Sequence, residues 1–416
     1  MLNPQRKKTT IWQNNPKEVS SMLKDKNIVL GVCGGIAAYK AADLTSKLKK
    51  LGANVYVIMT KSATEFVSPL TFRALSQNDV AVSTFDEPKA MEINHISLAD
   101  RADVFVIAPA TANMIGKIAC GIADDMLSTT VMATKAPCVI APAMNTNMYE
   151  NPIVQENIEK LKKLGFVFAP PRESRLACGT YGVGALCDVE DIIDYIYYAA
   201  CKEKTLSGKR VMVTAGATRE AIDPVRFLTN HSSGKMGFAI AKAACAMGAD
   251  VTLVSGKAEI KPPAGARVIN VVSAEDMYKV CMEEYKDKDI IVKAAAVGDF
   301  KAKEQSGNKI KKDGAAPQIE LCENPDILES LGKVKENRTL VGFCMETQDL
   351  IENAKKKLEK KNADMICANN LFDKGAGFGT DTNTITIIKR GGETVPLPNM
   401  SKEDAAFEIL KLAATL

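Results

Sequence analysis

Histidine is scarce in this chain, and several patterns that mark common protein functions are missing. The 416 residues include two histidines, His95 and His231, so an acid–base step that needs imidazole has two candidates. The 11 cysteines form no Cys-x-x-Cys pair, which argues against a structural zinc site. Their odd number and scattered spacing favour free thiols in a reducing compartment, so we expect a cytoplasmic protein.

Long apolar runs are missing too. No stretch approaches the roughly 20 apolar residues that span a bilayer, so we expect no membrane partner. Residues 1–25 are polar, and the basic residues Arg6, Lys7 and Lys8 precede no apolar core of a secretory signal, so we expect a loose N-terminal extension. A formal net charge of +4 over this length is too small to predict a nucleic-acid partner.

The residues that are present suit a globular protein with a sizeable core. Hydrophobic residues make up 46% of the chain and charged residues 25%, and the length suits two domains better than one. A strand–turn–helix–strand pattern opens twice, at residues 28–59 and at residues 210–255. In both places an apolar run ends in a glycine turn, and the following helical stretch ends at a glycine, Gly52 or Gly248.

These two openings predict two doubly wound, Rossmann-like α/β domains with mostly parallel sheets. We place the first domain at residues 26–200, a polar linker at 201–209 and the second domain at 210–416. Further continuous apolar runs, typical of strands covered on both faces, occur at residues 104–108, 138–141, 166–169, 289–292, 339–343, 364–368 and 384–388. Ser401 is placed to cap the last helix.

Small and amide residues follow the predicted strands of the first domain, where ligands of such sheets bind. Glycine lets a backbone approach a phosphate, and helix N-termini supply oriented N–H donors. The standard Gly-x-Gly-x-x-Gly fingerprint is missing, but two Pro-Ala motifs on neighbouring strands strengthen the prediction of a phosphate-bearing ligand. The candidate binding residues are Gly35, Ile36, Ala37, Thr60, Ser62, Ala110, Thr111, Asn113, Ser128, Ala143 and Met144.

Three residues of the first domain are candidates for chemistry, and each also has a purely structural reading. His95 precedes a short predicted helix and can be a surface or capping residue. Asn145 can cap a helix. Cys178 lies among glycines in a predicted mobile loop, which favours an exposed thiol over the inert core cysteine that is more common.

The second domain carries a denser set of candidate residues around a helix start at Ser232-Ser233-Gly234-Lys235, which would face an anion. Lys309 belongs to a basic run that is either a solvated face or a contact to a triphosphate. Asp299, at another strand end, could meet a base or a metal, or cap a helix. The remaining candidates are Gly216, Thr218, Arg226, Asn230 and Phe343.

Together these motifs resemble the family of bifunctional phosphopantothenoylcysteine decarboxylases and phosphopantothenate–cysteine ligases. The first domain carries Gly34-Gly35-Ile36-Ala37, Asn94-His95-Ile96, Pro-Ala-Thr-Ala-Asn113, Pro-Ala-Met-Asn145 and Ala-Cys178-Gly, and the second carries Thr-Ala-Gly-Ala-Thr-Arg219, Asp-Pro-Val-Arg226, Ser-Ser-Gly-Lys235 and Lys309-Ile-Lys-Lys. The resemblance implies an FMN-dependent decarboxylase fused to a ligase that uses CTP with Mg²⁺ or Mn²⁺.

The resemblance also implies a sequence of reactions. The ligase activates the carboxylate of 4′-phosphopantothenate as an acyl-cytidylate, and cysteine displaces CMP. The decarboxylase then removes CO₂ to leave 4′-phosphopantetheine. The family further implies a homo-oligomer in which a flavin site is completed between subunits.

By the same resemblance, His95 would be the acid–base group, Asn145 would hold the substrate carboxylate and Cys178 would donate a proton. In the ligase, Asn230 would position the acyl-cytidylate, Lys309 would stabilise charge at the α-phosphate and Asp299 would contact cytosine. The metal ligands are not identified. Ala185 stands where the family usually has a basic residue.

Two alternatives belong to other functional classes. A pair of nicotinamide-dependent reductase domains would share the strand–helix–strand pattern, but the missing glycine fingerprint counts against it. A non-catalytic regulatory subunit that binds flavin would tolerate the changed residue at position 185, but His95, Asn145 and Cys178 are all present.

Overall fold

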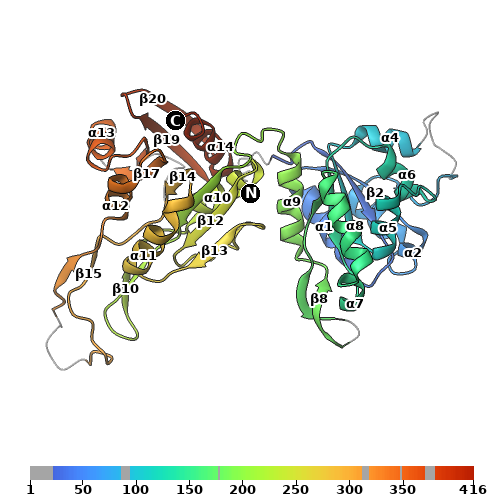
Figure 1. The fold of residues 1–416 in the computed structure, drawn as a ribbon, viewed down its shortest axis with the longest axis horizontal. Coiled ribbons are helices and arrows are strands. Elements are labelled where there is room, and N and C mark those ends of the chain that lie inside the picture. Colours follow the sequence, from blue (N-terminus) through green and yellow to red (C-terminus); the bar gives the residue numbers. More distant parts are fainter. Residues whose placement is uncertain (1–21, 86–93, 177–178, 312–317, 347–348, 371–379) are drawn as a thin grey trace, which may run out of the picture.

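Two α/β lobes lie next to each other along the longest axis of the computed structural model, which describes residues 22–85, 94–176, 179–311, 318–346, 349–370 and 380–416 (Figure 1). The first lobe ends with helix α9 (Val189–Ala200) and the second begins with strand β9 (Arg210–Ala215). Residues 201–209 form turns and irregular chain between them. The predicted α/β class with two parallel-sheet units is confirmed.

The first lobe contains a parallel sheet whose strand order is β3-β2-β1-β4-β5-β6, the order of a doubly wound dinucleotide-type sheet. Its strands are β1 (Asn27–Val32), β2 (Asn54–Met59), β3 (Val80–Ala81), β4 (Val104–Ala110), β5 (Cys138–Pro142) and β6 (Val167–Phe168). Strand β4 is buried at all seven positions, which explains why its sequence is one continuous apolar run.

Helices cover both faces of this sheet. On one face, α1 (Ala38–Lys50) and α9 share a buried cluster with Ile28 and Leu30 of β1. On the other face, α5 (Ala112–Cys120), α6 (Met126–Ala133) and α8 (Pro152–Lys163) pack around Val29 and Phe105. The remaining helices of this lobe are α2 (Lys61–Thr64), α3 (Pro69–Ser76), α4 (Asn94–Arg101) and α7 (Thr146–Tyr149).

The segment predicted as a mobile glycine loop is partly an antiparallel hairpin. Strand β7 (Arg172–Arg175) pairs with β8 (Tyr181–Ala185), and the hairpin projects from the lobe beside α7 (Figure 1). Residues 177 and 178 lie outside the described residues. The two glycines of β8 favoured the prediction of a loop, but small residues are also what lets this strand lie close to the chain before α7.

The second lobe contains an eight-stranded sheet of order β13-β12-β9-β14-β17-β18-β19-β20, parallel up to β18 and antiparallel beyond it. Its other strands are β12 (Asp250–Ser255), β13 (Arg267–Asn270), β14 (Ile290–Lys293), β17 (Thr339–Glu346), β18 (Met365–Asn370), β19 (Thr382–Lys389) and β20 (Thr394–Ser401). The sequence reading did not predict β20, because two prolines interrupt its apolar pattern.

The helices of this lobe are α10 (Lys235–Ala246), α11 (Ala274–Glu284), η1 (Tyr285–Asp287), α12 (Ile327–Val334), α13 (Leu350–Lys360) and α14 (Lys402–Ala413). Ser401 caps α14 as predicted, its side chain accepting from the amide of Asp404. Two short ribbons extend from the sheet (Figure 1): β10 (Arg219–Ala221) pairs with β11 (Phe227–Thr229), and β15 (Phe300–Ala302) pairs with β16 (Leu321–Glu323).

Helix α9 joins the two lobes. Its residues Tyr197 and Tyr198 are buried, and the Tyr197 ring lies 6.1 Å from the ring of Phe407 in α14. The Tyr198 hydroxyl donates to the carbonyl of Ala264, at 2.9 Å. One buried apolar cluster therefore runs from the first sheet through α9 into the second lobe.

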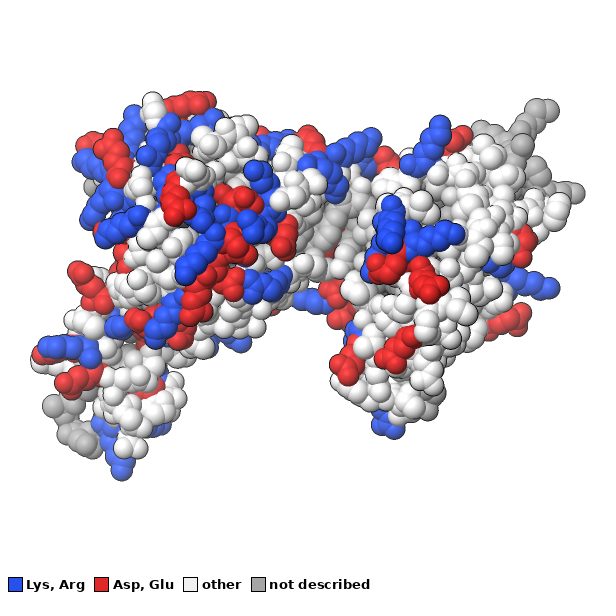
Figure 2. Space-filling model, in the orientation of Figure 1, with Lys and Arg blue, Asp and Glu red and all other residues white. Residues whose placement is uncertain are grey.

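Figure 2 shows acidic and basic side chains intermixed over the second lobe and wider uncharged areas on the first. Such mixing gives no extended basic surface on this face for a nucleic-acid backbone. Within the described ranges, none of the helices has both the length and the apolar character needed to cross a membrane.

Candidate active sites

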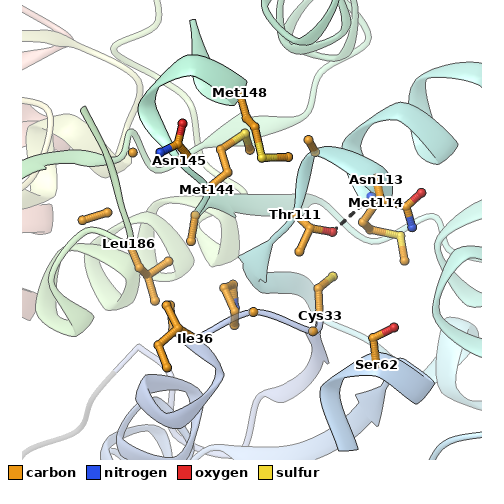
Figure 3. Close-up of a pocket in the computed structure, with 18 of the residues that line it drawn as sticks. Cys33, Ile36, Ser62, Thr111, Asn113, Met114, Met144, Asn145, Met148 and Leu186 are labelled. Carbon is orange, nitrogen blue, oxygen red and sulfur yellow. Dashed lines mark hydrogen bonds between the residues drawn. The ribbon is translucent and has the colours of Figure 1, made fainter. Parts of the chain in front are cut away.

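A cavity of about 890 Å³ opens at the carboxyl edge of the first sheet (Figure 3). Its walls come from the turn after β1, the starts of α2 and α5, the chain between β5 and α7, and the β7–β8 hairpin. Most of the predicted binding residues line it: Gly35, Ile36, Ala37, Thr60, Ser62, Thr111, Asn113, Ala143 and Met144. The sequence prediction thus brought together residues from four separate segments.

Helices α1, α2 and α5 begin at this cavity, and α2 and α5 have a capping side chain that the sequence allowed. The Thr60 hydroxyl accepts from the amide of Ala63 at the start of α2, and the Thr111 hydroxyl accepts from the amide of Met114 at the start of α5 (Figure 3). Helix N-termini carry partial positive charge and free N–H groups. The arrangement favours an anionic ligand such as a phosphate.

The two glycines after β1, Gly34 and Gly35, have different structural roles. A Cβ on Gly34 would lie 2.4 Å from the Cβ of Ser62, so only glycine lets this turn pack against α2. A Cβ on Gly35 would meet nothing closer than the Thr111 methyl, at 4.0 Å. Gly35 therefore leaves open space on the cavity side, where a ligand can approach the backbone.

Positive charge exceeds negative charge around the cavity. Its charged lining residues are Lys40, Lys61, Lys117, Arg172 and Arg175 against Asp125. Lys117 is held by Asp124 and Asp125, at 2.6 and 2.7 Å. Burial, followed by the nearby Arg172, lowers the pKa of Lys40. Sequence reasoning missed these cations because they are scattered along the chain, although Arg172 and Arg175 flank a visible glycine-rich segment.

The hairpin forms one wall of the cavity. The carbonyl of Gly184 accepts from the amide of Met144, at 2.9 Å, and a Cβ on Gly184 would lie 2.3 Å from the carbonyl oxygen of Met144. Arg172 pairs with Ala185 across the ladder and lines the cavity. A basic side chain therefore lies on the strand next to Ala185.

Asn145 caps a helix, as one of its two interpretations had it, and also lines the cavity. Its side chain accepts from the amide of Asn147 and so caps α7, and the residue also lines the cavity (Figure 3). Cys33 lies in the floor of the cavity, and burial raises the pKa of its thiol to about 12. Cys33 therefore stays protonated at neutral pH and is no candidate nucleophile.

Three predicted residues do not line this cavity. His95 is the second residue of α4, partly buried and away from the cavity walls. Ala110 is buried in β4, and its carbonyl accepts from Ala143. The Ser128 hydroxyl takes part in a capping box with Asp125 at the start of α6, and the residue is not among those that line the cavity. Cys178 lies outside the described residues.

The second lobe has a glycine cradle at the start of α10. Gly216 and Gly234 both have φ of +78°, and a Cβ on Gly234 would lie 3.1 Å from the Cα of Gly216. The Ser232 hydroxyl accepts from the amide of Gly234. The Asn230 amide donates to the carbonyls of Ala296 and Val297, which ties the segment before α10 to the loop after β14.

Other predicted residues of this lobe hold the loops that surround the cradle. The Thr218 hydroxyl is buried and accepts from the amide of Gly298. Lys235 pairs with Asp381, at 2.6 Å, and Ser233 lies between Ser232 and the cradle glycine. These contacts show structural roles for Thr218 and Lys235 that the glycine-rich pattern did not predict.

A carboxylate fixes the segment that carries Lys309. Asp223 accepts from the Arg226 guanidinium and from the amide of Ile310, and Arg226 donates to the Ile310 carbonyl at 2.8 Å. The Arg226 guanidinium beside Asp223 holds the pKa of that carboxyl well below its usual range. Arg226 and Asp223 therefore position Lys309.

A cavity of about 360 Å³ lies at the carboxyl edge of the second sheet. The predicted binding residues Asp299 and Phe343 line it, whereas Lys309 and the cradle residues do not. Sequence reasoning missed Lys293, Asn324, Lys357 and Lys361, which also line this cavity. The signal for Lys293 was present, because a lysine at the end of an apolar strand run is unusual.

No three His, Cys, Asp or Glu side chains of the described ranges come together as a metal site. Divalent cations such as Mg²⁺ often bind through one or two carboxylates and the phosphates of a nucleotide. Asp299 is a carboxylate at the cavity of the second lobe that fits this mode.

Comparison with known proteins gives matches over both lobes. Residues 16–200 match the model of the flavoprotein family, and residues 206–416 match that of the DNA/pantothenate metabolism flavoprotein C-terminal domain. The coenzyme A biosynthesis bifunctional protein CoaBC of Bacillus subtilis is 51% identical over 95% of this chain and 98% of its own length. The protein of that name from Escherichia coli is 40% identical over 92% of this chain and 95% of its own length.

Among solved structures, the C-terminal domain of a coenzyme A biosynthesis bifunctional protein CoaBC is 42% identical. It covers 51% of this chain and 97% of its own, with a TM-score of 0.45.

Proposed function

Because the chain belongs to the family of coenzyme A biosynthesis bifunctional proteins, we propose that it joins cysteine to 4′-phosphopantothenate and decarboxylates the product to 4′-phosphopantetheine. The observation that carries this proposal is that each lobe offers a ligand cavity at the carboxyl edge of its own sheet. The first suits a large anionic ligand, and the second lies beside a glycine cradle. Neither the reductase nor the regulatory alternative has support from the relatives.

The residues of the first cavity fit FMN. Its open Gly35, its helix N-termini and its excess of basic residues suit the phosphate of that group. Bound FMN would supply a reversible two-electron acceptor, which the cysteine carboxylate needs because no electron sink stands beside it. Asn145 would hold the substrate carboxylate, and Arg172, next to Ala185 on the hairpin, would supply the basic contact that position 185 lacks.

His95 would move protons during oxidation and decarboxylation, and Cys178 would donate the last proton. Since His95 does not line the cavity of its own chain, we propose that a second copy of the chain brings this residue to the site. The first lobe leaves large apolar side chains exposed, among them Tyr39, Leu70 and Ile153, at 62, 69 and 69%. Such surface favours a homo-oligomer.

In the second lobe, the cradle of Gly216 and Gly234 and the start of α10 would hold an anionic group of the substrates. Asn230 would position the acyl-cytidylate and Lys309 would stabilise charge at the α-phosphate. Asp299 and Phe343 would hold the nucleotide in the neighbouring cavity. Mg²⁺ or Mn²⁺ would enter with the triphosphate, and scattered free cysteines support a cytoplasmic location.

The direct test uses the purified full chain with 4′-phosphopantothenate, cysteine, CTP and Mg²⁺, and identifies the products by mass. We expect 4′-phosphopantetheine, CMP, pyrophosphate and CO₂, and a protein that is yellow or becomes yellow with FMN. Absence of any product that contains the cysteine nitrogen would contradict the ligase assignment. Phosphopantothenoylcysteine supplied alone tests the decarboxylase separately.

Replacing CTP by ATP in the same assay tests nucleotide choice. We expect faster amide formation with CTP. A clear preference for ATP would contradict this part of the proposal and leave the two reactions in place.

A further inference from the structure

One carboxylate connects the two lobes through an arginine and a lysine. Asp188, the residue before α9, accepts from the Arg172 guanidinium through one oxygen, at 2.9 Å, and from the Lys261 ammonium through the other, at 3.0 Å. Arg172 lies on β7 of the hairpin and lines the first cavity. Lys261 belongs to the second lobe, on the chain between β12 and β13. A side chain of the second lobe is therefore linked by hydrogen bonds to the wall of the first cavity.

The carboxylate of Asp188 is not used in the way that its position predicts. Asp188 is the N-cap residue of α9, where aspartate is preferred because its side chain can accept from the first amides of a helix. Among the described residues, the Asp188 side chain accepts from no amide of this first turn. Its oxygens bind the two cations, so the residue holds side chains together at the start of α9.

The segment that carries Lys261 is fastened to α9 at further points. Lys261 also pairs with Asp191, at 2.7 Å. The amide of Ala264 donates to Asp194, at 3.0 Å, and the carbonyl of Ala264 accepts from the Tyr198 hydroxyl, at 2.9 Å. Lys261 is thus held at the first turn of α9 by contacts that do not involve the hairpin.

Charges of both lobes act on Asp188. The hydrogen bond from Lys261 is the largest influence that lowers the pKa of this carboxyl, and the charges of Arg172 and Lys40 act in the same direction. Asp188 is therefore ionised at neutral pH. Lys40 and Arg172 both line the first cavity, so this carboxylate opposes part of the positive charge that a ligand there would meet.

Lys261 and Arg172 share a carboxylate that one guanidinium could occupy alone. A carboxylate can bind arginine through both oxygens, and such a two-point pair is stronger than a single hydrogen bond. Here one oxygen of Asp188 is taken by Lys261, and Arg172 is bound through the other. An arginine has five N–H donors, so a single bond to Asp188 leaves others to face a ligand.

We propose that Lys261 of the second lobe is a positioning residue for the decarboxylation in the first. By holding one oxygen of Asp188, it limits the grip of that carboxylate on Arg172 and keeps the guanidinium directed at an anionic substrate. Without Lys261, Asp188 binds Arg172 through both oxygens and withdraws positive charge from the cavity wall. This inference rests on the proposed decarboxylase function and gives the ligase lobe a part in the reaction of the other lobe.

The test replaces Lys261 by methionine in the full chain. We expect the KM for phosphopantothenoylcysteine to rise about threefold with little change in kcat, the size of effect typical of one half-exposed ion pair. Lys261→Arg, which keeps a cation beside Asp188, should restore the KM of the parent. Lys411→Met is the matched control, because Lys411 is a lysine of the second lobe that pairs with Glu203 of the linker, at 2.9 Å. It should behave as the parent.

A second background separates positioning from a general loosening of the two lobes. In Asp188→Ala, the further change Lys261→Met should leave the KM where it is, because Lys261 acts through Asp188. A loosened junction between the lobes would raise the KM in this background as well.

Chemical labelling gives a readout that does not depend on turnover. Phenylglyoxal modifies arginine, and a guanidinium held at two points by a carboxylate reacts more slowly than one held at a single point. Peptide mass mapping should show labelling of Arg172 slowed about threefold in Lys261→Met and restored in Lys261→Arg. Arg175 of the same hairpin is the internal reference and should keep its rate.

A KM in Lys261→Met equal to that of the parent overturns the inference, and so does an equal rise in Lys411→Met or in the Asp188→Ala background. Labelling of Arg172 that is unchanged or faster in Lys261→Met overturns it too. If the parent releases no CO₂ from phosphopantothenoylcysteine, the proposed function fails, and the labelling still decides whether Lys261 limits the grip of Asp188 on Arg172.

Discussion

At the scale of the residue, one carboxylate of the second lobe, Asp223, holds the segment that carries Lys309 in place through hydrogen bonds. Asp223 accepts from the backbone amides of Val225 and Arg226 through one oxygen, and from the Arg226 side chain and the Ile310 amide through the other. Every polar contact of the carboxylate is an accepted hydrogen bond. An asparagine side chain at position 223 would place its NH₂ group against N–H donors in either of the two orientations of its amide.

We therefore expect Asp223→Asn to release the segment that carries Lys309. The KM for CTP should rise between about tenfold and a hundredfold with a smaller change in kcat, since a misplaced binding group costs affinity and alignment. Decarboxylation of supplied phosphopantothenoylcysteine should not change. Asp287→Asn is the control, because Asp287 is a 55% exposed carboxylate that pairs with Lys288. An unchanged KM in Asp223→Asn would show that this clamp does not position Lys309.

The position of a binding residue could be predicted from the sequence where the backbone and capping preferences of its residue type determine that position. Gly35, Thr60, Thr111 and Asn145 follow strands, and the capping preferences of Thr and Asn explain their positions at helix starts. Ser128 looked equivalent, but its hydroxyl is used inside a capping box. Periodicity does not reveal which capping residue also lines a cavity: Thr60 and Thr111 cap helices and line it, whereas Ser128 is not among the lining residues.

At the scale of the element, the β7–β8 hairpin depends on glycine where it meets the chain before α7. Gly184 has φ of +150° and lies against the Met144 carbonyl, so an added methyl group would strain the strand and collide with backbone. Strain of this kind costs about 1–3 kcal/mol. Movement of the hairpin away from Met144 and Asn145 would relieve this strain at the lowest cost in free energy.

We expect Gly184→Ala to lower the flavin content of the purified protein and to raise the KM for phosphopantothenoylcysteine, with ligase activity unaffected. Flavin absorbance and steady-state kinetics measure the two effects. Gly116→Ala, in the middle of α5, is the matched control, because a Cβ there meets nothing closer than 3.9 Å. Flavin content equal to that of the parent in Gly184→Ala would count against a role of the hairpin in closing the cavity.

Elements with a strong periodic pattern were predicted well, and the short ones were not. The strand–turn–helix–strand patterns predicted at 28–59 and 210–255 end where β2 and β12 end, and the run at 104–108 lies within β4. The ribbons β10–β11 and β15–β16 were not predicted, because strands of three residues are too short to show a periodic hydrophobic pattern. The same ribbons carry or flank Arg226, Asp299 and Asn324, so the least predictable elements support the ligase site.

At the scale of the whole molecule, His95 is not among the residues that line the cavity with Asn145, so the proposed function calls for a second copy of the chain. We predict that His95→Asn abolishes CO₂ release while FMN stays bound. A second inactive variant, Asn145→Asp, damages the cavity itself. Subunits of the two variants, mixed after partial dissociation, should regain part of the activity, since one copy supplies the intact cavity and another the intact histidine.

Mass spectrometry of released CO₂ with differently tagged subunits measures this complementation. Each variant mixed with itself is the control and should stay inactive. Undiminished decarboxylation in His95→Asn, or inactive hybrids whose mixed composition is verified through the tags, would exclude a histidine shared between copies. The sequence predicted His95 just before a short helix, and the structure has it as the second residue of α4. No pattern within one chain tells which copy a residue serves.

Helix α9 has a consequence for how this protein can be divided. Its buried tyrosines, Tyr197 and Tyr198, pack in the apolar cluster that both lobes share, and the Tyr198 hydroxyl donates to the carbonyl of Ala264 in the second lobe. Division of the chain at the linker would uncover Tyr197 on one product and Phe407 of α14 on the other, because these two rings lie against each other. Each half would then expose to water part of an aromatic contact that the single chain keeps covered, so the exposed apolar surface favours keeping the two lobes joined.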